Sequence, residues 1–202
     1  QEAKQKSAYV LDLISKKTLT PDERARVVEE SVRYWTDHVN EGFLQFRKSV
    51  STDYTAVEWE DEGAVFRDIH GKEFIDILGG YGIYVVGHRH PRVMKAVRDQ
   101  LDRQAIHSQE LIDPLRTYLA NRVALITPGD LQYAFFTNSG TESVEGCLKM
   151  AVLATGRHHI LGAAGAFHGK SMGSLGGTSK AVFREPFLPL LHWTHVPWGD
   201  ID

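Results

Sequence analysis

Residues 136–145 read FTNSGTESVE, and they give the clearest indication of fold class in this chain. The apolar run 133–136 leads into them and is typical of a strand buried on both faces. A helical pattern follows to about Ala154, and Gly156 ends it. A strand, a tight Ser-Gly-Thr turn and a helix in this order predict an α/β layer.

The start of this helix is suited to binding an anion. The first backbone N–H groups of a helix have no partner within it and carry the positive end of its dipole. Gly140 lets a ligand approach the backbone, and the hydroxyls of Ser139 and Thr141 can donate to anionic oxygens. The same residues fit a second interpretation, in which Asn138 or Ser139 only caps the helix. The Rossmann and P-loop spacings are absent, so the pattern does not favour a nucleotide.

The flanking segments continue the alternation of strands and helices. We predict helices at 91–103 and 114–126, each opened by a proline that fits the first helical turn. Strands are expected at 159–161 and 193–196, with a Gly/Ala/Ser-rich loop at 162–179 between them. This order predicts a mostly parallel sheet, and no helix follows the last strand to cover it. We therefore expect the chain to be the N-terminal portion of a longer protein.

The first eighty residues follow a different pattern. Amphipathic helices are predicted at 3–15 and from Thr20 to about residue 40, where an Asn-Glu-Gly sequence ends the second helix. The period then changes to that of short strands, with a hairpin signal at His70-Gly71 between the last two. The expected strands are 57–59, 65–69 and 74–77.

Composition excludes several classes of protein. The 202 residues are 42% hydrophobic and 24% charged, as in ordinary globular proteins. The formal charge of -3 gives no support for a nucleic-acid or anionic-membrane partner, and no apolar run is long enough to span a membrane. The single cysteine, Cys147, excludes an internal disulfide and suits the cytoplasm. The paired histidines lack the partners of a metal site, so we expect no metal.

An aromatic residue and a histidine follow the next strand in the sequence GAFHGKS, residues 165–171. Ligands of open α/β sheets bind at the edge where this segment is expected. Phe167 could stack there on a flat heteroaromatic ring, with His168 beside it. Both residues also fit a structural interpretation, Phe167 as a core anchor and His168 as a satisfied polar residue.

Taken together, these motifs resemble the class III pyridoxal-phosphate (PLP) aminotransferases. The resemblance covers essentially the whole chain and rests on four segments in the family's order: DIHGKEFID at 68–76, GHRHP at 87–91, NSGTE at 138–142 and FHGKS at 167–171. Within the class, three segments are most similar to the subgroup that acts on putrescine: FLQFRKS at 43–49, GGYGI at 79–83 and HSQEL at 107–111. One departure is Gly146-Cys147, where alanines are usual; Gly146 should cost its helix about 1 kcal/mol.

The resemblance implies fold type I, an α/β architecture. Residues 1–80 would form N-terminal helices and small-domain strands. Residues 81–202 would form an interface segment and the first, incomplete part of the large, mostly parallel-sheet domain that binds PLP. The family's enzymes are homodimers or dimers of dimers, with active sites built from both subunits.

The resemblance also implies site residues. Ser139, Gly140 and Thr141 would bind the PLP phosphate through backbone amides and the threonine hydroxyl. Phe167 would stack on the pyridine ring with His168 beside it. Near the substrate channel, at a subunit interface, would lie Tyr81 and Gln109.

The implied reaction moves the terminal amino group of a diamine or ω-amino compound, with putrescine favoured, to a 2-keto acid such as 2-oxoglutarate. No catalytic residue is assigned, because none of the lysines, Lys170 included, stands in the family's Schiff-base context. That lysine, like the acidic partner of the pyridinium nitrogen, comes downstream in the family. Two alternatives stay open: another ω-aminotransferase, acting on ornithine, acetylornithine or 4-aminobutyrate, or a non-catalytic fragment that binds phosphate or PLP.

Overall fold

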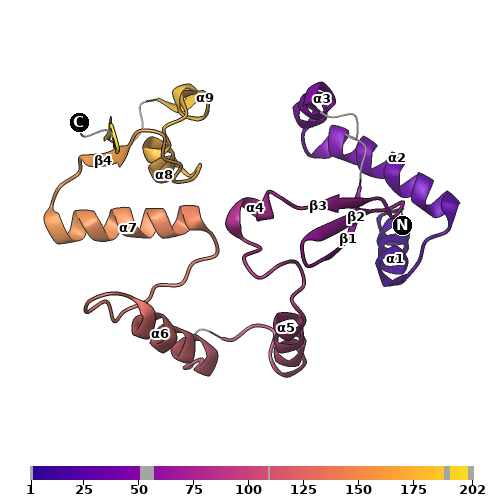
Figure 1. Ribbon diagram of the computed structural model, residues 1–202, viewed down its shortest axis with the longest axis horizontal. Coiled ribbons are helices and arrows are strands. Elements are labelled where there is room, and N and C mark those ends of the chain that lie inside the picture. Colours follow the sequence, from indigo (N-terminus) through magenta and orange to yellow (C-terminus); the bar gives the residue numbers. More distant parts are fainter. Residues whose placement is uncertain (1, 51–56, 109, 189–191, 200–202) are drawn as a thin grey trace. The chain divides into compact units, whose positions relative to one another are not determined.

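The computed structural model describes residues 2–50, 57–108, 110–188 and 192–199. The chain divides into two compact units, Gln1–Ile106 and His107–Asp202, which we describe separately (Figure 1). The sequence-based boundary between residues 80 and 81 concerns the domains of the complete fold, and it stays a prediction.

The first unit begins with three helices. They are α1 (Glu2–Ser15), α2 (Pro21–His38) and α3 (Glu41–Val50). The start of α2 is a capping box, as predicted: the Glu23 amide donates to Thr20 Oγ1 over 3.3 Å, and the Thr20 amide donates to the Glu23 carboxylate over 2.8 Å. Helix α3 was not predicted. Asn40 ends one helix and caps the next, because its Oδ1 accepts from the Phe43 amide at 3.0 Å.

A three-stranded antiparallel sheet follows these helices. Its strands pair in chain order: β1 (Glu58–Glu62), β2 (Val65–Asp68) and β3 (Glu73–Ile75). The hairpin between β2 and β3 lies where it was predicted, and Gly71 takes a φ of 86°. Asp68 holds this turn, because its Oδ1 accepts from the amides of His70 and Lys72 at 2.9 Å each. A small core of Leu19, Val27 and Ile69 joins the sheet to the start of α2.

The segment after β3 contains the short turn α4 (Gly79–Gly82), and the helix α5 (Pro91–Arg103) closes the unit with the bounds predicted. His88 attaches this segment to the sheet. Its Nδ1 lies 2.9 Å from Asp61 Oδ2, and its Nε2 lies 2.7 Å from Asp76 Oδ2. Both ring nitrogens donate only in the imidazolium form, so two carboxylates favour the charged histidine. The hydrogen bond to Asp76 raises the pKa of His88, and the same bond lowers the pKa of Asp76.

These shifts predict a pH window for the stability of the first unit. The contribution of His88 is fully present below its unfolded pKa of about 6.5 and is lost as pH rises through its higher folded pKa. The contribution of Asp76 is present above about 4 and is lost as pH falls through its lower folded pKa. We therefore expect His88→Gln to lower the melting temperature most between these limits, and thermal unfolding across this pH range measures it. A difference from wild type that stays constant above neutral pH would contradict this assignment.

The second unit combines helices with a parallel pair of strands. Its elements are α6 (Pro114–Ile126), α7 (Gly140–Thr155), β4 (Ile160–Ala163), α8 (Met172–Gly177), α9 (Ala181–Arg184), the 3-10 turn Glu185–Phe187 and β5 (Trp193–Val196). Strands β4 and β5 run parallel from the pair Ile160–Trp193 to the pair Ala163–Val196, which confirms the predicted orientation of this pair. Helix α7 ends at Gly156, whose φ is 66°, as a left-handed C-cap.

Two predictions for this unit are wrong. Residues 133–136 form no strand, and Tyr133 is fully exposed (100%). A strand needs a neighbour for its backbone groups, and within the described residues nothing pairs with this run. The loop predicted at 162–179 contains the helix α8, although four of its residues are Gly or Ser, which are poor helix formers: Gly173, Ser174, Gly176 and Gly177.

Candidate functional site

The start of α7 has the geometry of an anion site. Ser139 is its N-cap, with extended backbone (φ -153°, ψ 159°), and Ser139 Oγ accepts from the Glu142 amide at 3.4 Å. Within the described part of the chain, the amides of Gly140 and Thr141 make no hydrogen bond. A Cβ added at Gly140 would meet no atom within 4 Å, so the space beside it is open. Two free amides at an open helix N-terminus can hold an anionic oxygen.

The Thr141 hydroxyl faces the interior of the unit. Thr141 Oγ1 lies 2.7 Å from Ser171 Oγ and 2.6 Å from Ser174 Oγ, and it accepts from the Ser171 amide at 3.3 Å. The two predicted motifs, 138–142 and 167–171, therefore meet in the second unit. A hydrogen bond from the Thr141 hydroxyl to a ligand would compete with these contacts, whereas bonds from the backbone amides would not.

Glu145, one turn further along α7, accepts hydrogen bonds from the start of α8. Its Oε1 accepts from the Ser171 hydroxyl at 2.5 Å, from the Gly173 amide at 2.8 Å and from the Ser174 amide at 3.0 Å. These bonds, that from Ser171 above all, lower the pKa of the Glu145 carboxyl, so the group is ionised at neutral pH. Sequence reasoning missed Glu145, because its partners lie 26 to 29 residues away and leave no local signal.

Phe167 and His168 have different environments. Phe167 is 61% exposed, and its ring meets the edge of Phe183 at a centroid distance of 6.5 Å. The ring of His168 stacks on Trp193 at 5.8 Å, and its amide donates to Thr178 Oγ1 at 3.0 Å. A face of Phe167 is therefore free for a ligand, while His168 already has an aromatic partner.

Trp193 is a second residue that the sequence did not single out. Its Nε1 donates to the Gly173 carbonyl at 3.1 Å, and its ring packs where Cβ atoms at Gly176 and Gly177 would stand. The glycines of α8 let the ring approach the backbone. In the sequence, only two features could have indicated this contact: the aromatic residue Trp193 on a predicted strand, and the pair Gly176-Gly177 in the preceding segment.

Of the two predicted substrate residues, the structure describes one. Tyr81 belongs to the first unit; it is 90% exposed and takes a left-handed backbone conformation with a φ of 59°. Gln109 lies outside the described residues.

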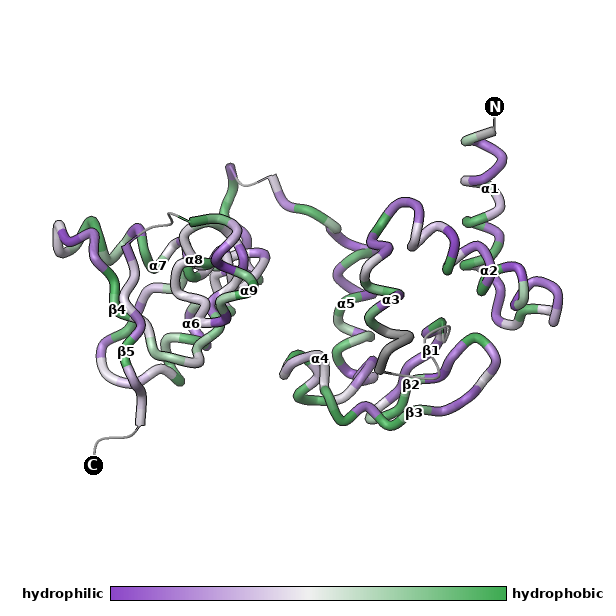
Figure 2. Tube along the Cα trace, turned by 90° about the horizontal axis from the view of Figure 1, so that it is seen from above, coloured by the Kyte–Doolittle hydropathy of each residue, from purple (hydrophilic) through white to green (hydrophobic). Residues whose placement is uncertain are grey.

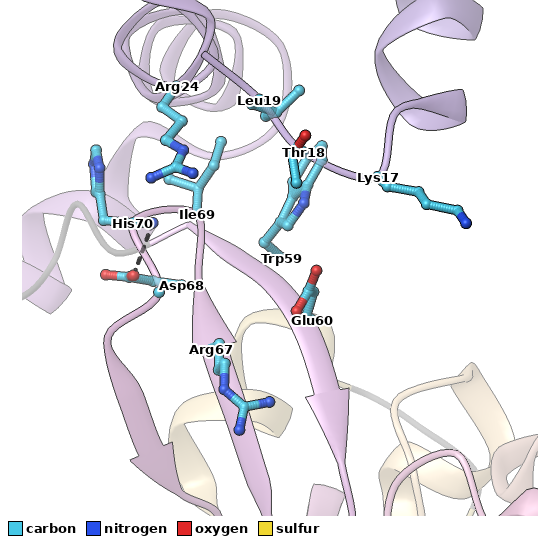
Figure 3. A pocket seen from close by; sticks show the side chains of 11 residues that line it. Lys17, Thr18, Leu19, Arg24, Trp59, Glu60, Arg67, Asp68, Ile69 and His70 are labelled. Atoms are coloured by element: carbon cyan, nitrogen blue, oxygen red, sulfur yellow. Dashed lines mark hydrogen bonds between the residues drawn. The ribbon is translucent and has the colours of Figure 1, made fainter. Parts of the chain in front are cut away.

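A pocket in the first unit was not predicted (Figure 3). The connection between α1 and α2 lines one side, and β1, β2 and the hairpin line the other. Positive charge comes from Lys17, Arg24 and Arg67, and negative charge from Glu60 and Asp68. Because Asp68 already accepts from two turn amides, and because the lining has no single sign of charge, we assign no ligand to this pocket.

The described residues offer neither a metal cluster nor a membrane-spanning helix. Among them, no three or more His, Cys, Asp or Glu side chains are grouped so that they could hold a metal ion. None of the helices in this part of the chain is long and apolar enough to cross a membrane.

The family model described as "Aminotransferase class-III" matches residues 48–199. The chain belongs to the class III aminotransferase family. Comparison with solved aminotransferase structures supports the same fold. An (S)-enantioselective omega-transaminase from Thermomicrobium roseum is 27% identical with a TM-score of 0.74, and the match covers 90% of this chain and 41% of that one.

Two more distant structures show the same fold. A taurine:2-oxoglutarate aminotransferase from Bifidobacterium kashiwanohense, solved with PLP and glutamate, is 22% identical, with a TM-score of 0.71 over 84% of this chain and 37% of that one. An ornithine aminotransferase from Toxoplasma gondii is 20% identical, with a TM-score of 0.64 over 85% of this chain and 43% of that one. The chain thus spans less than half the length of these proteins. The predicted fold class, the α/β fold type I of PLP aminotransferases, is confirmed.

Proposed function

We propose that the full-length protein is a PLP-dependent aminotransferase that moves a terminal amino group from a diamine or ω-amino compound to a 2-keto acid such as 2-oxoglutarate. Membership of the class III family supports the reaction class. The observation that carries the proposal is the start of α7, where the amides of Gly140 and Thr141 are free and the space beside Gly140 is open. Such a site suits the doubly charged phosphate of PLP.

The residues of the second unit fit the cofactor. The amides of Gly140 and Thr141 would hold the phosphate, with the Ser139 hydroxyl beside them, and the exposed ring of Phe167 would stack on the pyridine ring. When bound, PLP supplies the electron sink that amino-group transfer requires. The chain's own residues bind and orient it. His168, stacked on Trp193, holds the backbone from which Phe167 projects.

For the amino donor, we favour putrescine. The segments at 43–49, 79–83 and 107–111 support this subgroup by resemblance. Among the structural neighbours, one is named for taurine, one for ornithine and one as an omega-transaminase, and taurine and ornithine both carry a terminal amine. Tyr81 and Gln109 would line the substrate channel.

We further propose that the protein acts as a homodimer or a dimer of dimers in the cytoplasm. The segment around α4 supports an assembly, because several of its apolar side chains are exposed, and Figure 2 colours much of this segment at the hydrophobic end of the scale. They are Ile77, Leu78, Tyr81, Ile83, Val85 and Val86. An apolar surface of this kind is usually covered by protein. The single cysteine, Cys147, suits a reducing compartment.

A panel of amino donors tests the substrate. The PLP-loaded full-length protein should transfer an amino group from putrescine to 2-oxoglutarate with a kcat/KM about tenfold or more above that for ornithine, acetylornithine or 4-aminobutyrate. The physical reason is that a channel suited to an uncharged or cationic end leaves the carboxylate of the other donors unpaired. A preference for one of these donors would move the protein to that subgroup. Bound PLP without any transfer would support the non-catalytic alternative.

A further inference from the structure

Glu145 joins two parts of the second unit that are distant in sequence. It lies on the second turn of α7, and three groups of residues 171–174 donate to its Oε1. The contact is close: a Cβ at Gly173 would lie 2.3 Å from the Glu145 carboxylate. A helix N-terminus normally finds such an acceptor on its own N-cap residue, but Ser171, the N-cap of α8, makes no side-chain bond of this kind. Glu145, which belongs to α7, supplies this acceptor instead.

The direction of the hydroxyl bonds follows from this arrangement. The carboxylate can only accept, so the single proton of the Ser171 hydroxyl is donated to Glu145. In the 2.7 Å contact between the two hydroxyls, Ser171 can therefore only accept, so a hydrogen bond there is donated by Thr141. That bond uses the Thr141 proton inside the unit. Glu145 thus fixes the orientation of Thr141 through one intervening hydroxyl.

The Ser174 hydroxyl packs closely against the hydroxyls of Thr141 and Ser171. Ser174 is fully buried (0% exposed), and its Oγ lies 2.6 Å from Thr141 Oγ1 and 2.9 Å from Ser171 Oγ. A buried hydroxyl that lost these partners would have no water to replace them. The four side chains Thr141, Glu145, Ser171 and Ser174, which we call the Glu145 network, therefore hold the first turn of α7 against the start of α8.

We propose that Glu145 is a positioning residue for the phosphate site: acting through Ser171, it holds Thr141 so that the amides of Gly140 and Thr141 face the ligand. This inference rests on the proposed function, because it concerns the same site. The backbone amides then bind the phosphate, and the Thr141 hydroxyl has a structural role. Glu145 itself touches neither the ligand nor the reacting atoms.

Two variants of the full-length protein test this role. Glu145→Gln keeps the size of the side chain and removes its charge. Ser171→Ala removes the hydroxyl that joins Glu145 to Thr141 and that contacts Ser174, and it leaves the amides of Gly173 and Ser174 with their acceptor. The matched control is Asp130→Asn, which makes the same carboxylate-to-amide change at an exposed residue of the same unit, whose side chain makes no hydrogen bond within the described residues. The readouts are the dissociation constants of PLP and of pyridoxal, which lacks the phosphate, and the melting temperature of the cofactor-free protein.

We expect both network variants to raise the dissociation constant of PLP about fivefold or more, the effect of one weakened charge-assisted hydrogen bond. Pyridoxal binding should change less than twofold, and Asp130→Asn should match wild type in both. A role confined to folding would instead lower the melting temperature and weaken both ligands equally, which would overturn the inference. Unchanged PLP binding in both variants would also overturn it. A wild-type protein that binds PLP no better than pyridoxal would overturn the proposed phosphate site itself, and the inference with it.

Discussion

Gly169→Ala is expected to lower the free energy of unfolding of the second unit by about 3 kcal/mol, the combined cost of overpacking and of backbone strain. Gly169 is buried and has a φ of 123°, outside the range that side-chain-bearing residues adopt readily. A Cβ there would lie 2.3 Å from Thr141 Oγ1 and 2.7 Å from Ser174 Oγ. The substitution would push these hydroxyls apart, so PLP binding should fall as well.

The matched control for this substitution is Gly165→Ala. Gly165 also has a positive φ, 84°, but a Cβ there meets nothing within 4 Å. Gly165→Ala should lower the free energy of unfolding only through backbone strain, by about 1 kcal/mol. Urea unfolding of both variants measures the difference. Equal losses in the two variants would show that the close packing around Gly169 does not exist in the protein.

Val85→Asp is expected to weaken self-association on the order of 100-fold and to lower activity in parallel. Val85 is 83% exposed among the other apolar side chains that follow β3. If a second subunit covers this surface, as we propose, the aspartate would be buried without a partner, which costs about 3 kcal/mol or more. Activity should follow association, because each pocket would borrow residues from its neighbour.

Sedimentation across a concentration series measures this effect. Gln104→Asp, which adds the same charge at an exposed polar position of the same unit, serves as the control and should leave association unchanged. A Val85→Asp protein that sediments like wild type would remove this segment from the interface. A fully active monomer in either form would refute the proposed assembly.

Local chemistry explains which elements could be predicted. Helices α5 and α6 have the predicted bounds, because a proline opens each of them, and β5 likewise spans Trp193–Val196. The run 133–136 has the same apolar character as a buried strand, but strand pairing depends on a partner that a local pattern does not contain. Asn40 shows a different limit, since one residue type both ends a helix and caps the next.

The site was predictable only in part, for the same reason. The Ser-Gly-Thr turn and the FHGKS segment carry local signals, and the structure brings Thr141 within hydrogen-bond distance of Ser171. The residues that hold them, Glu145 and Trp193, act through contacts with distant segments and carry no motif. His88 is a similar case: its neighbourhood reads as a turn before α5, while its contacts with Asp61 and Asp76 depend on the folded sheet.

A crystal structure of the full-length protein with PLP tests the central claim most directly. The account predicts phosphate oxygens at about 2.7–3.2 Å from the amide nitrogens of Gly140 and Thr141. It also predicts that the Thr141 hydroxyl stays on Ser171 and that the ring of Phe167 lies against the pyridine ring. A phosphate bound elsewhere in the protein, with these two amides hydrogen-bonded to protein groups, would contradict the account.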